Sequence, residues 1–349
     1  MKSLVVTILA ALPVAVPASA QSCTGDLNGD RTVTGADIGI LLGEWGTSGG
    51  TTGADIDGNG TVSGSDLGLL LGAWGPCPVM VPVWATLVEA LPDPAVVTNP
   101  TLLAAIEATG LAWRVRDAAT QVEMLLVPPG TFQRGCIMGS NQFGCYPFEQ
   151  PVHQVTLTNA FYLGRYEVTQ AQWVATMGYN PSGFQSASTQ VPASQVPNRP
   201  VELVSWTTIQ GYLSATGFRL PTEAEWEYAC RAGTQTPFYN GSTDDSTVGS
   251  LAWYSANSVN QTRPVGGKLA NALGFQDMLG NVWEWVNDWY GGYTSEPQTN
   301  PTGPASGLGR VFRGGSRVND TDIVRSSYIR IGSPGVATFD LGFRVARNP

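Results

Sequence analysis

The sequence predicts a large α+β domain rich in irregular backbone, preceded by a small all-α module. The 349 residues include 42 glycines, 24 prolines and 11 tryptophans, which is typical of ordered coil held in place by buried aromatic side chains. Beyond residue 118, short strand-like segments do not alternate with long helices, so a doubly wound parallel sheet is not expected. Near the N-terminus, an acidic segment of twelve residues occurs twice.

The first twenty residues have the features of an export signal. Lys2 supplies a positive charge, an apolar stretch follows, and the small residues ASA end at Ala20. We therefore expect a secreted, periplasmic or cell-surface protein, cleaved near Ala20; a retained anchor is the alternative. No later segment predicts a membrane span. A net charge of −9 without a basic stripe argues against a nucleic-acid partner.

Export permits disulfide bonds. Cys23 and Cys77 bracket the acidic module, and Cys136 and Cys145 bracket a short loop. We expect these two bridges, although sequence alone allows other pairings. Cys230 is left over on the apolar face of a predicted helix, where we expect a buried inert thiol and not a nucleophile.

The duplicated acidic segment has the spacing of a calcium-binding loop. DLNGDRTVTGAD begins at Asp26, and DIDGNGTVSGSD begins 29 residues later at Asp55. Positions 1, 3, 5, 7, 9 and 12 carry the oxygen ligands that a hard cation prefers. Arg31 occupies position 6 of the first loop, where positive φ would cost about 1 kcal/mol, so the first site is expected to be weaker. The predicted ligands are Asp26, Asn28, Asp30, Thr32, Thr34 and Asp37, then Asp55, Asp57, Asn59, Thr61, Ser63 and Asp66.

Each loop is followed by a helix with apolar residues at i, i+3, i+4 and i+7. We expect the two helices to pack face to face, because neither is long enough to be stable alone. The apolar positions are Ile38, Leu41, Leu42 and Trp45, then Leu67, Leu70, Leu71 and Trp74.

A duplicated loop–helix unit with no helix before the loop resembles a type I dockerin, over about residues 24–76. The resemblance implies two bound Ca²⁺ ions and a cohesin-like or cell-surface protein as partner. A polar linker is the alternative. The recognition positions of that family offer few polar contacts here, since they are occupied by Gly35, Ala36, Gly64 and Ser65.

A linker helix is expected to start at Asn99 and Pro100 and to end before Gly110. The whole chain is therefore expected to contain four segments. The segments are a signal peptide at 1–20, a calcium-binding module at 21–78, a linker with one helix at 79–118 and the large domain at 119–349.

Seven motifs occur in order in the large domain: MLLVPPGTFQRG, FYLGRYEVTQAQW, RPVELVSW, GFRLPTEAEWEYACRAGT, DMLGNVWEWVNDW, RVFRGGS and LGFRVAR. Together they resemble the formylglycine-generating enzyme (sulfatase-modifying factor) family, over about residues 120–348. The resemblance implies a C-type-lectin-like fold. Its oxidising members use copper(I), held by two cysteines, and molecular oxygen to convert a substrate cysteine into formylglycine.

The two copper cysteines of those members lie three and eight residues after the serine of GGS. Here that serine is Ser316, and the two positions are Asn319 and Val324. Copper(I) selects thiolate ligands, so we expect neither copper nor catalytic residues. Trp283 also matches a groove position of the family.

Two function classes remain open. The first is a non-oxidising binding or scaffold domain with a peptide or glycan ligand, which we favour. The alternative is an oxidoreductase of the formylglycine-generating type that recruits thiolate from its substrate, or another enzyme acting on peptide cysteine in the same groove. His153 is the single histidine, and we expect a surface or hydrogen-bonded strand residue there, not a base.

The resemblance also implies one Ca²⁺ in the large domain. Its ligands would be the side chains of Asp277 and Glu284 and the carbonyl groups of Gly280 and Val282. The alternative is that Glu284 pairs with a late arginine. Seven arginines lie between residues 310 and 347; internal ion pairs are favoured over a groove for an anionic ligand.

Overall fold

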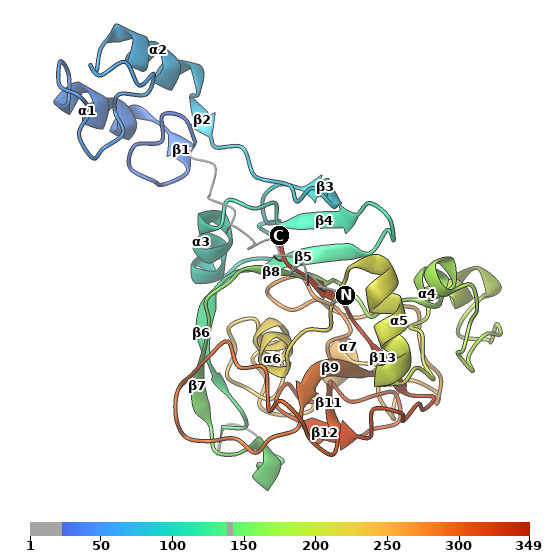
Figure 1. Cartoon of the computed structure of the whole chain (residues 1–349). Helices are drawn as coiled ribbons and strands as arrows, with labels where there is room; N and C mark the ends of the chain where they lie inside the picture. The colour runs from blue at the N-terminus through green and yellow to red at the C-terminus, as the bar shows by residue number, and fades with distance from the viewer. Residues whose placement is uncertain (1–22, 138–141) are drawn as a thin grey trace, which may run out of the picture. The chain divides into compact units, whose positions relative to one another are not determined.

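The computed structural model describes residues 23–137 and 142–349 (Figure 1). The predicted signal peptide, residues 1–20, lies outside these ranges. The chain divides into a smaller unit that ends at Pro78 and a larger unit, Val79–Pro349. Within the described ranges, no helix combines the length and the apolar character needed to cross a bilayer.

The smaller unit contains two loop–helix repeats. The first ends in helix α1 (Gly35–Gly43) and the second in helix α2 (Gly64–Gly72), where the sequence predicts them. Each helix begins with a capping box, which satisfies backbone N–H groups of its first turn. Strands β1 (Thr32–Val33) and β2 (Gly75–Pro76) pair antiparallel.

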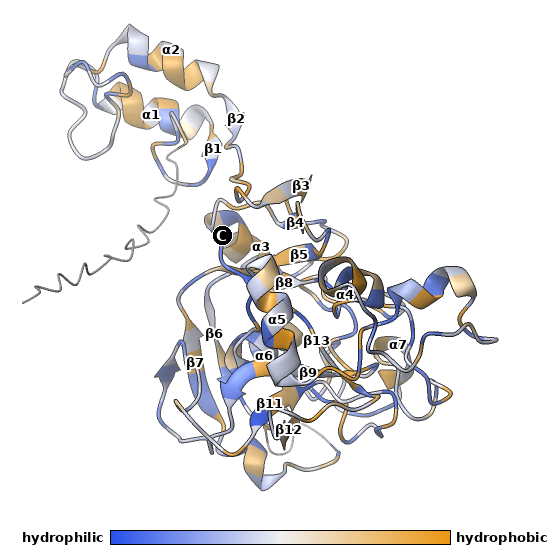
Figure 2. Cartoon of the chain, turned by 45° about the vertical axis from the view of Figure 1, so that its right-hand side comes forward, coloured by the Kyte–Doolittle hydropathy of each residue, from blue (hydrophilic) through white to orange (hydrophobic). Residues whose placement is uncertain are grey.

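The helices of the smaller unit bury only part of the predicted apolar stripe. The fully buried apolar residues are Val33, Leu41, Ala54, Val62 and Leu70. Four stripe residues are instead 48–55% exposed, namely Leu42, Trp45, Leu71 and Trp74. Both helices end before their tryptophan, so helical periodicity does not direct those rings inward. Figure 2 shows the apolar stretches on α1 and α2.

A five-stranded antiparallel sheet joins the beginning and the end of the larger unit (Figure 1). Its strand order is β14-β8-β5-β4-β3. The strands are β3 (Ala85–Glu89), β4 (Arg114–Asp117), β5 (Glu123–Val127), β8 (Phe161–Gly164) and β14 (Ala346–Arg347).

Two further sheets complete the strands of this unit. One sheet has the strand order β12-β11-β9-β13 and the other has the order β10-β7-β6. Each contains one parallel pair, β9 with β13 and β7 with β10. The strands are β6 (Gly130–Arg134), β7 (His153–Leu157), β9 (Trp283–Trp289), β10 (Gln298–Thr299), β11 (Arg310–Arg313), β12 (Ile329–Gly332) and β13 (Leu341–Phe343).

Short helices and long coil connect the strands. Helix α6 opens with the predicted capping box of Thr222 and Glu225, and α5 ends at Gly217 in the left-handed conformation. The helices are α3 (Pro100–Ala108), α4 (Gln170–Met177), α5 (Trp206–Thr216), α6 (Glu223–Arg231) and α7 (Val248–Leu251), with 3₁₀ turns at Pro147–Glu149 and Ala193–Asn198.

The segment expected as a linker, 79–118, lies in the larger unit. The predicted helix is present as α3, with Asn99 as its N-cap. In addition, β3 and β4 extend the five-stranded sheet. The reason is apolar burial, because Ile106 and Trp113 have at most 2% of their surface exposed.

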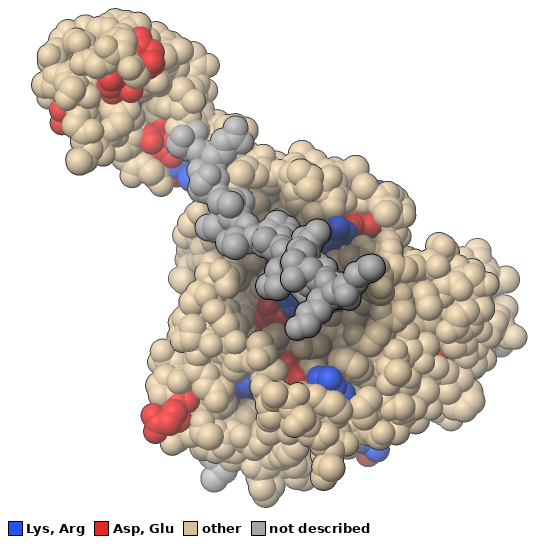
Figure 3. Space-filling view, viewed as in Figure 1, with Lys and Arg blue, Asp and Glu red and all other residues tan. Residues whose placement is uncertain are grey.

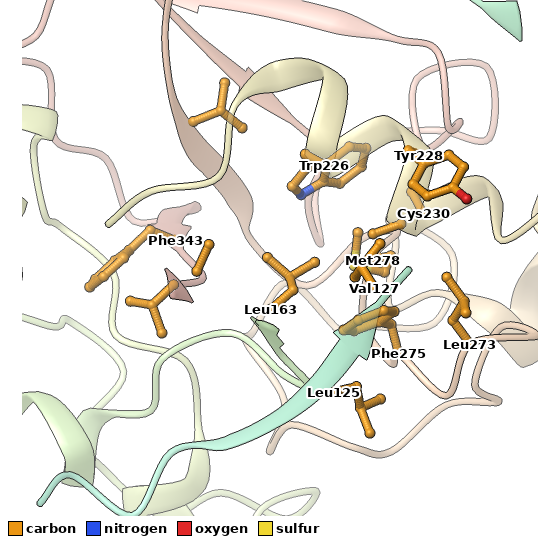
Figure 4. Packing of buried hydrophobic residues seen from close by; sticks show 14 of the residues in the cluster. Leu125, Val127, Leu163, Trp226, Tyr228, Cys230, Leu273, Phe275, Met278 and Phe343 are labelled. Atoms are coloured by element: carbon orange, nitrogen blue, oxygen red, sulfur yellow. The ribbon is translucent and has the colours of Figure 1, made fainter. Parts of the chain in front are cut away.

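The core of the larger unit lies between β5, β8, α6 and the strands around β9. Figure 4 shows Leu125 and Val127 beside Phe275, with Leu163 between them and Trp226, all in one cluster. Cys230 belongs to this cluster and is a free, buried thiol, and burial raises its pKa to about 12. It is therefore an inert thiol at neutral pH, as predicted.

The two expected disulfide bonds are confirmed. Cys23 pairs with Cys77, and Cys136 pairs with Cys145. The first bridge closes a loop with a sequence separation of 54 residues. In the chain-entropy model, a bridge over a loop of this length stabilises by about 4 kcal/mol.

Candidate functional site

Ser316 lies at the centre of a small polar network after β11. Its hydroxyl group is 2.7 Å from Oδ1 of Asn319 and 3.0 Å from Oδ2 of Asp340. The Ser316 backbone N–H also donates to Asn319 Oδ1, at 2.9 Å. The carbonyl of Asn319 in turn accepts from Ser255 N. Asn319 therefore holds the turn after β11 in place.

The residues at the two copper positions do not fit copper(I). Val324 is completely buried, and its side chain lies against the backbone of Gly315. It has no ligand atom, while the amide oxygen of Asn319 already accepts two hydrogen bonds from Ser316. A soft cation that prefers thiolate finds no sulfur donor at these positions.

Trp283 lies next to this network and is buried, with 1% of its surface exposed. It starts β9, and its backbone N–H donates to the carbonyl of Asp340, at 2.8 Å. Its ring contacts Phe312 and Tyr328, with centroids 5.3 and 6.0 Å away. The indole Nε1 is buried and has no hydrogen-bond partner among the described residues. The four predicted groove residues are thus in one region of the larger unit.

Three buried carboxylates surround one arginine beneath β9. Both oxygens of Glu284 accept from Arg344, at 2.6 Å each, so the alternative expected for Glu284 is observed. Trp226 Nε1 adds a third bond to Glu284, at 2.7 Å. Glu167 accepts from the backbone N–H of Val282. Asp277 accepts from Gly266 N, while its Oδ1 is buried without a partner among the described residues.

This cluster carries more negative than positive groups. Burial raises the pKa of Asp277 to about 6, and hydrogen bonding to Gly266 and the charge of Arg344 oppose this shift. Burial, followed by repulsion from Asp277 and Glu284, raises the pKa of Glu167 well above its usual value. A cation bound here would relieve the repulsion. The calcium set of Asp277, Gly280, Val282 and Glu284 stays a prediction.

Most of the late arginines are structural, as predicted. Arg313, which is fully buried, bonds to Glu223 at 2.9 Å and to Glu227 at 2.5 Å. Three others form ion pairs: Arg325 with Glu149, Arg344 with Glu284 and Arg347 with Asp117. His153 is a buried strand residue whose Nδ1 lies 3.1 Å from the carbonyl of Pro151.

In the smaller unit, the last acid of each loop is buried and closes the loop. Asp37 and Asp66 each accept three backbone N–H bonds, which lower their pKa values although desolvation acts against this. In the second loop, carboxylate oxygens of Asp55, Asp57 and Asp66 lie within 4.8 Å of one another. Figure 3 shows acidic side chains outnumbering basic ones on the visible face of this unit.

The other predicted loop ligands surround these acids. Arg31 has φ of +66°, as expected, and the equivalent residue of the second loop is Gly60. Exposed or half-buried ligands are Asp26, Asn28, Asp30, Thr32, Thr34, Asn59, Thr61 and Ser63.

Sequence reasoning missed two residues of the larger unit. Glu167 is 117 positions before Glu284 in the chain, and no spacing rule relates them. Asp340 stands directly before LGFRVAR, and its position beside a motif was the available signal. The fold and the site define a mixed helix–sheet domain with a serine–amide–carboxylate network and no thiolate pair.

Comparison with known proteins identifies the family. Residues 111–349 match the family described as "Sulfatase-modifying factor enzyme 1-like domain", and the chain belongs to it. The formylglycine-generating enzyme of Streptomyces coelicolor is 30% identical over 319 residues, covering 74% of this chain and 96% of that enzyme. The expected family resemblance is therefore confirmed for the larger unit.

Other proteins similar to this chain carry names that differ from formylglycine-generating enzyme. The serine/threonine-protein kinase pkn1 of Chlamydia caviae is 32% identical over 64% of this chain, but the match spans only 38% of that kinase. Among solved structures, Treponema denticola variable protein 1 has a TM-score of 0.59 and 30% identity, covering 65% of this chain and 95% of that one. PvdO from Pseudomonas aeruginosa has a TM-score of 0.57 and 28% identity, covering 68% and 98%.

Proposed function

We propose that the larger unit is a non-oxidising binding domain with a peptide-like ligand, and that the smaller unit is a calcium-dependent tether for it. The observation that carries the first part is the pair Asn319 and Val324 at the copper positions. The surrounding groove residues Trp283 and Ser316 keep the identities that the family uses next to a peptide. Binding without oxidation requires Trp283 and Ser316 and does not require the two copper-binding cysteines.

The polar network supports binding because it offers both hydrogen-bond donors and acceptors. The Ser316 hydroxyl lies 3.0 Å from Asp340, and the buried Nε1 of Trp283 has no partner among the described residues. Ser316 and Trp283 are buried, so a peptide backbone, with one N–H and one C=O per residue, would meet this network through the half-buried side chains of Asn319 and Asp340. A glycan is the second ligand class consistent with these groups.

The tether proposal rests on the duplicated loops. Seven acidic residues and one arginine lie between residues 23 and 78, so this unit carries a net charge of −6. Two Ca²⁺ ions would neutralise most of it and bring the carboxylates of each loop together. The module resembles a dockerin, and its partner would be a cohesin-like or cell-surface protein on the outside of the cell.

One experiment separates binding from oxidation. The protein is incubated with copper(I), oxygen and a peptide that carries the cysteine-containing sulfatase motif, and the peptide mass is followed. We expect the peptide to keep its thiol. A mass change that matches conversion of the thiol to an aldehyde would instead establish the alternative, an oxidoreductase that takes its copper ligand from the substrate.

A further inference from the structure

A cavity of about 290 Å³ lies at the end of β9 opposite Trp283. Three charged side chains line it: Arg134 of β6, Glu223 at the start of α6 and Asp288 of β9. Each has at most 4% of its surface exposed. Buried charge is unfavourable unless it is paired, so the partners of these groups indicate what the cavity can bind.

Glu223 has its charge fully compensated by protein groups. Its carboxylate accepts from Arg134 Nη2 at 2.5 Å, from Arg313 Nη1 at 2.9 Å and from the Tyr293 hydroxyl at 2.8 Å. A ligand would have to displace one of these partners. Glu223 therefore positions Arg134 and does not itself offer a site.

Asp288 and Arg134 have atoms without partners. Oδ2 of Asp288 accepts from the backbone N–H of Glu223 at 2.9 Å, while Oδ1 has no partner among the described residues. Arg134 uses only Nη2 of its guanidinium group; Nε is buried and unpaired, and Nη1 has no partner in the described ranges. One anionic acceptor and one cationic donor thus line the same cavity.

The aromatic rings near the cavity are already covered. Arg310 stacks on the ring of Trp289 at 3.9 Å, and Arg134 on that of Tyr293 at 4.5 Å. His153 contacts the Tyr293 ring edge-on, with centroids 4.9 Å apart. Ligands that need a free aromatic face, such as methylated ammonium groups, are not favoured. A purely cationic or purely anionic ligand would meet one like charge.

We propose that this cavity binds a free α-amino acid, whose ammonium group pairs with Asp288 and whose carboxylate accepts from Arg134. A zwitterion compensates both unused groups and leaves the net charge of the cluster unchanged. The volume, at the lower end of ligand pockets of ~300–1,000 Å³, suits a small molecule. The proposal concerns a site apart from the Ser316 groove and does not depend on the function proposed there.

The binding is expected to depend on pH. Burial and the nearby charge of Glu223 raise the pKa of Asp288 to about 7, while the Glu223 N–H and Arg134 oppose the shift. The other charged groups around Asp288 are Glu225 on α6 and Arg310 on β11. Since the ionised carboxylate is the ammonium acceptor, affinity should rise at least about tenfold between pH 5.5 and pH 8.

The test is calorimetric titration of the full chain with a panel of free α-amino acids at pH 8. For each one that binds, the amine without the carboxylate and the carboxylic acid without the amine are also titrated. We expect at least one amino acid to bind, and both truncated compounds to bind at least about tenfold more weakly. Binding of the amine alone at equal affinity, or of no amino acid at all, would overturn the proposal.

Two variants place the binding in this cavity. Asp288→Asn keeps the shape and the acceptor for Glu223 N but removes the charge, so it should lose at least tenfold in affinity and lose the pH dependence. Asp245→Asn, an exposed aspartate outside the cavity, should bind like the wild type. Thermal unfolding verifies that both variants fold. Unchanged affinity in the folded Asp288→Asn protein contradicts the assignment.

Discussion

Glu227 shows how single residues hold the coil-rich unit together. It is completely buried, and although burial alone would raise its pKa, Arg231, Arg313 and Arg134 lower it to about 2. Its oxygens bond to Arg231 Nε and to Arg313 Nη2. Because the folded pKa lies below the unfolded one, Glu227 stabilises the fold above about pH 4.5. This contribution is lost as the pH falls toward 2.

Glu227→Gln is expected to lower the free energy of unfolding by about 3–5 kcal/mol at pH 7, because Arg231 loses its buried carboxylate and Arg313 keeps only Glu223. The loss should shrink near pH 2, where wild-type Glu227 is half protonated. Urea unfolding at both pH values measures this. Glu296→Gln, at an exposed position, is the matched control. An equal loss at both pH values would show that the charge is not the cause.

The copper positions also allow a gain-of-function prediction. Asn319→Cys combined with Val324→Cys restores two sulfur donors at positions that the family uses, and Val324 is replaced by a side chain of no greater volume. Under reducing conditions, the double variant should bind one copper(I) tightly, measured by competition with a chromogenic chelator. Equal binding by the wild type would refute the idea that these two residues exclude copper.

At the scale of elements, the sequence predicted what depends on local rules. The capping box of α6, the Gly217 terminus of α5 and both loop–helix repeats follow from neighbouring residues. Both disulfides were expected because each cysteine pair brackets one segment. The joining of β3 and β4 to the main sheet was not predicted, since strand pairing depends on tertiary contacts. Glu167 was missed for the same reason, because its contact with Val282 is a tertiary one. Trp45 and Trp74 are exposed because each helix ends before its tryptophan.

The first of the two loops predicted to bind calcium carries a testable strain. Arg31 has φ of +66°, a conformation that glycine adopts without a steric penalty. Arg31→Gly should therefore strengthen calcium binding by the first loop about fivefold, equivalent to about 1 kcal/mol. Gly60→Arg in the second loop should weaken binding to a similar extent. Calcium titration followed by calorimetry measures both, and no change in either variant would contradict the assignment of position 6.

For the whole molecule, the two units should respond differently to the removal of calcium. Without Ca²⁺, the acidic side chains of the smaller unit repel one another, whereas the larger unit has its own extensive core. Chelation with EDTA should make residues 23–78 sensitive to protease and leave residues 79–349 intact, as read by mass spectrometry. Tryptophan fluorescence is a poor probe, because Trp45 and Trp74 are already about half exposed. Protection of residues 23–78 in EDTA would speak against the tether.

The larger unit belongs to a family with formylglycine-generating relatives, and it carries Asn319 and Val324 where that resemblance implies the two copper ligands. The most direct measurement is the mass of a cysteine-containing sulfatase-type peptide after incubation with the full chain, copper(I) and oxygen. The peptide should retain its cysteine, while a formylglycine-generating enzyme with both cysteines converts it in parallel. Aldehyde formed by this chain at a comparable rate would contradict the account.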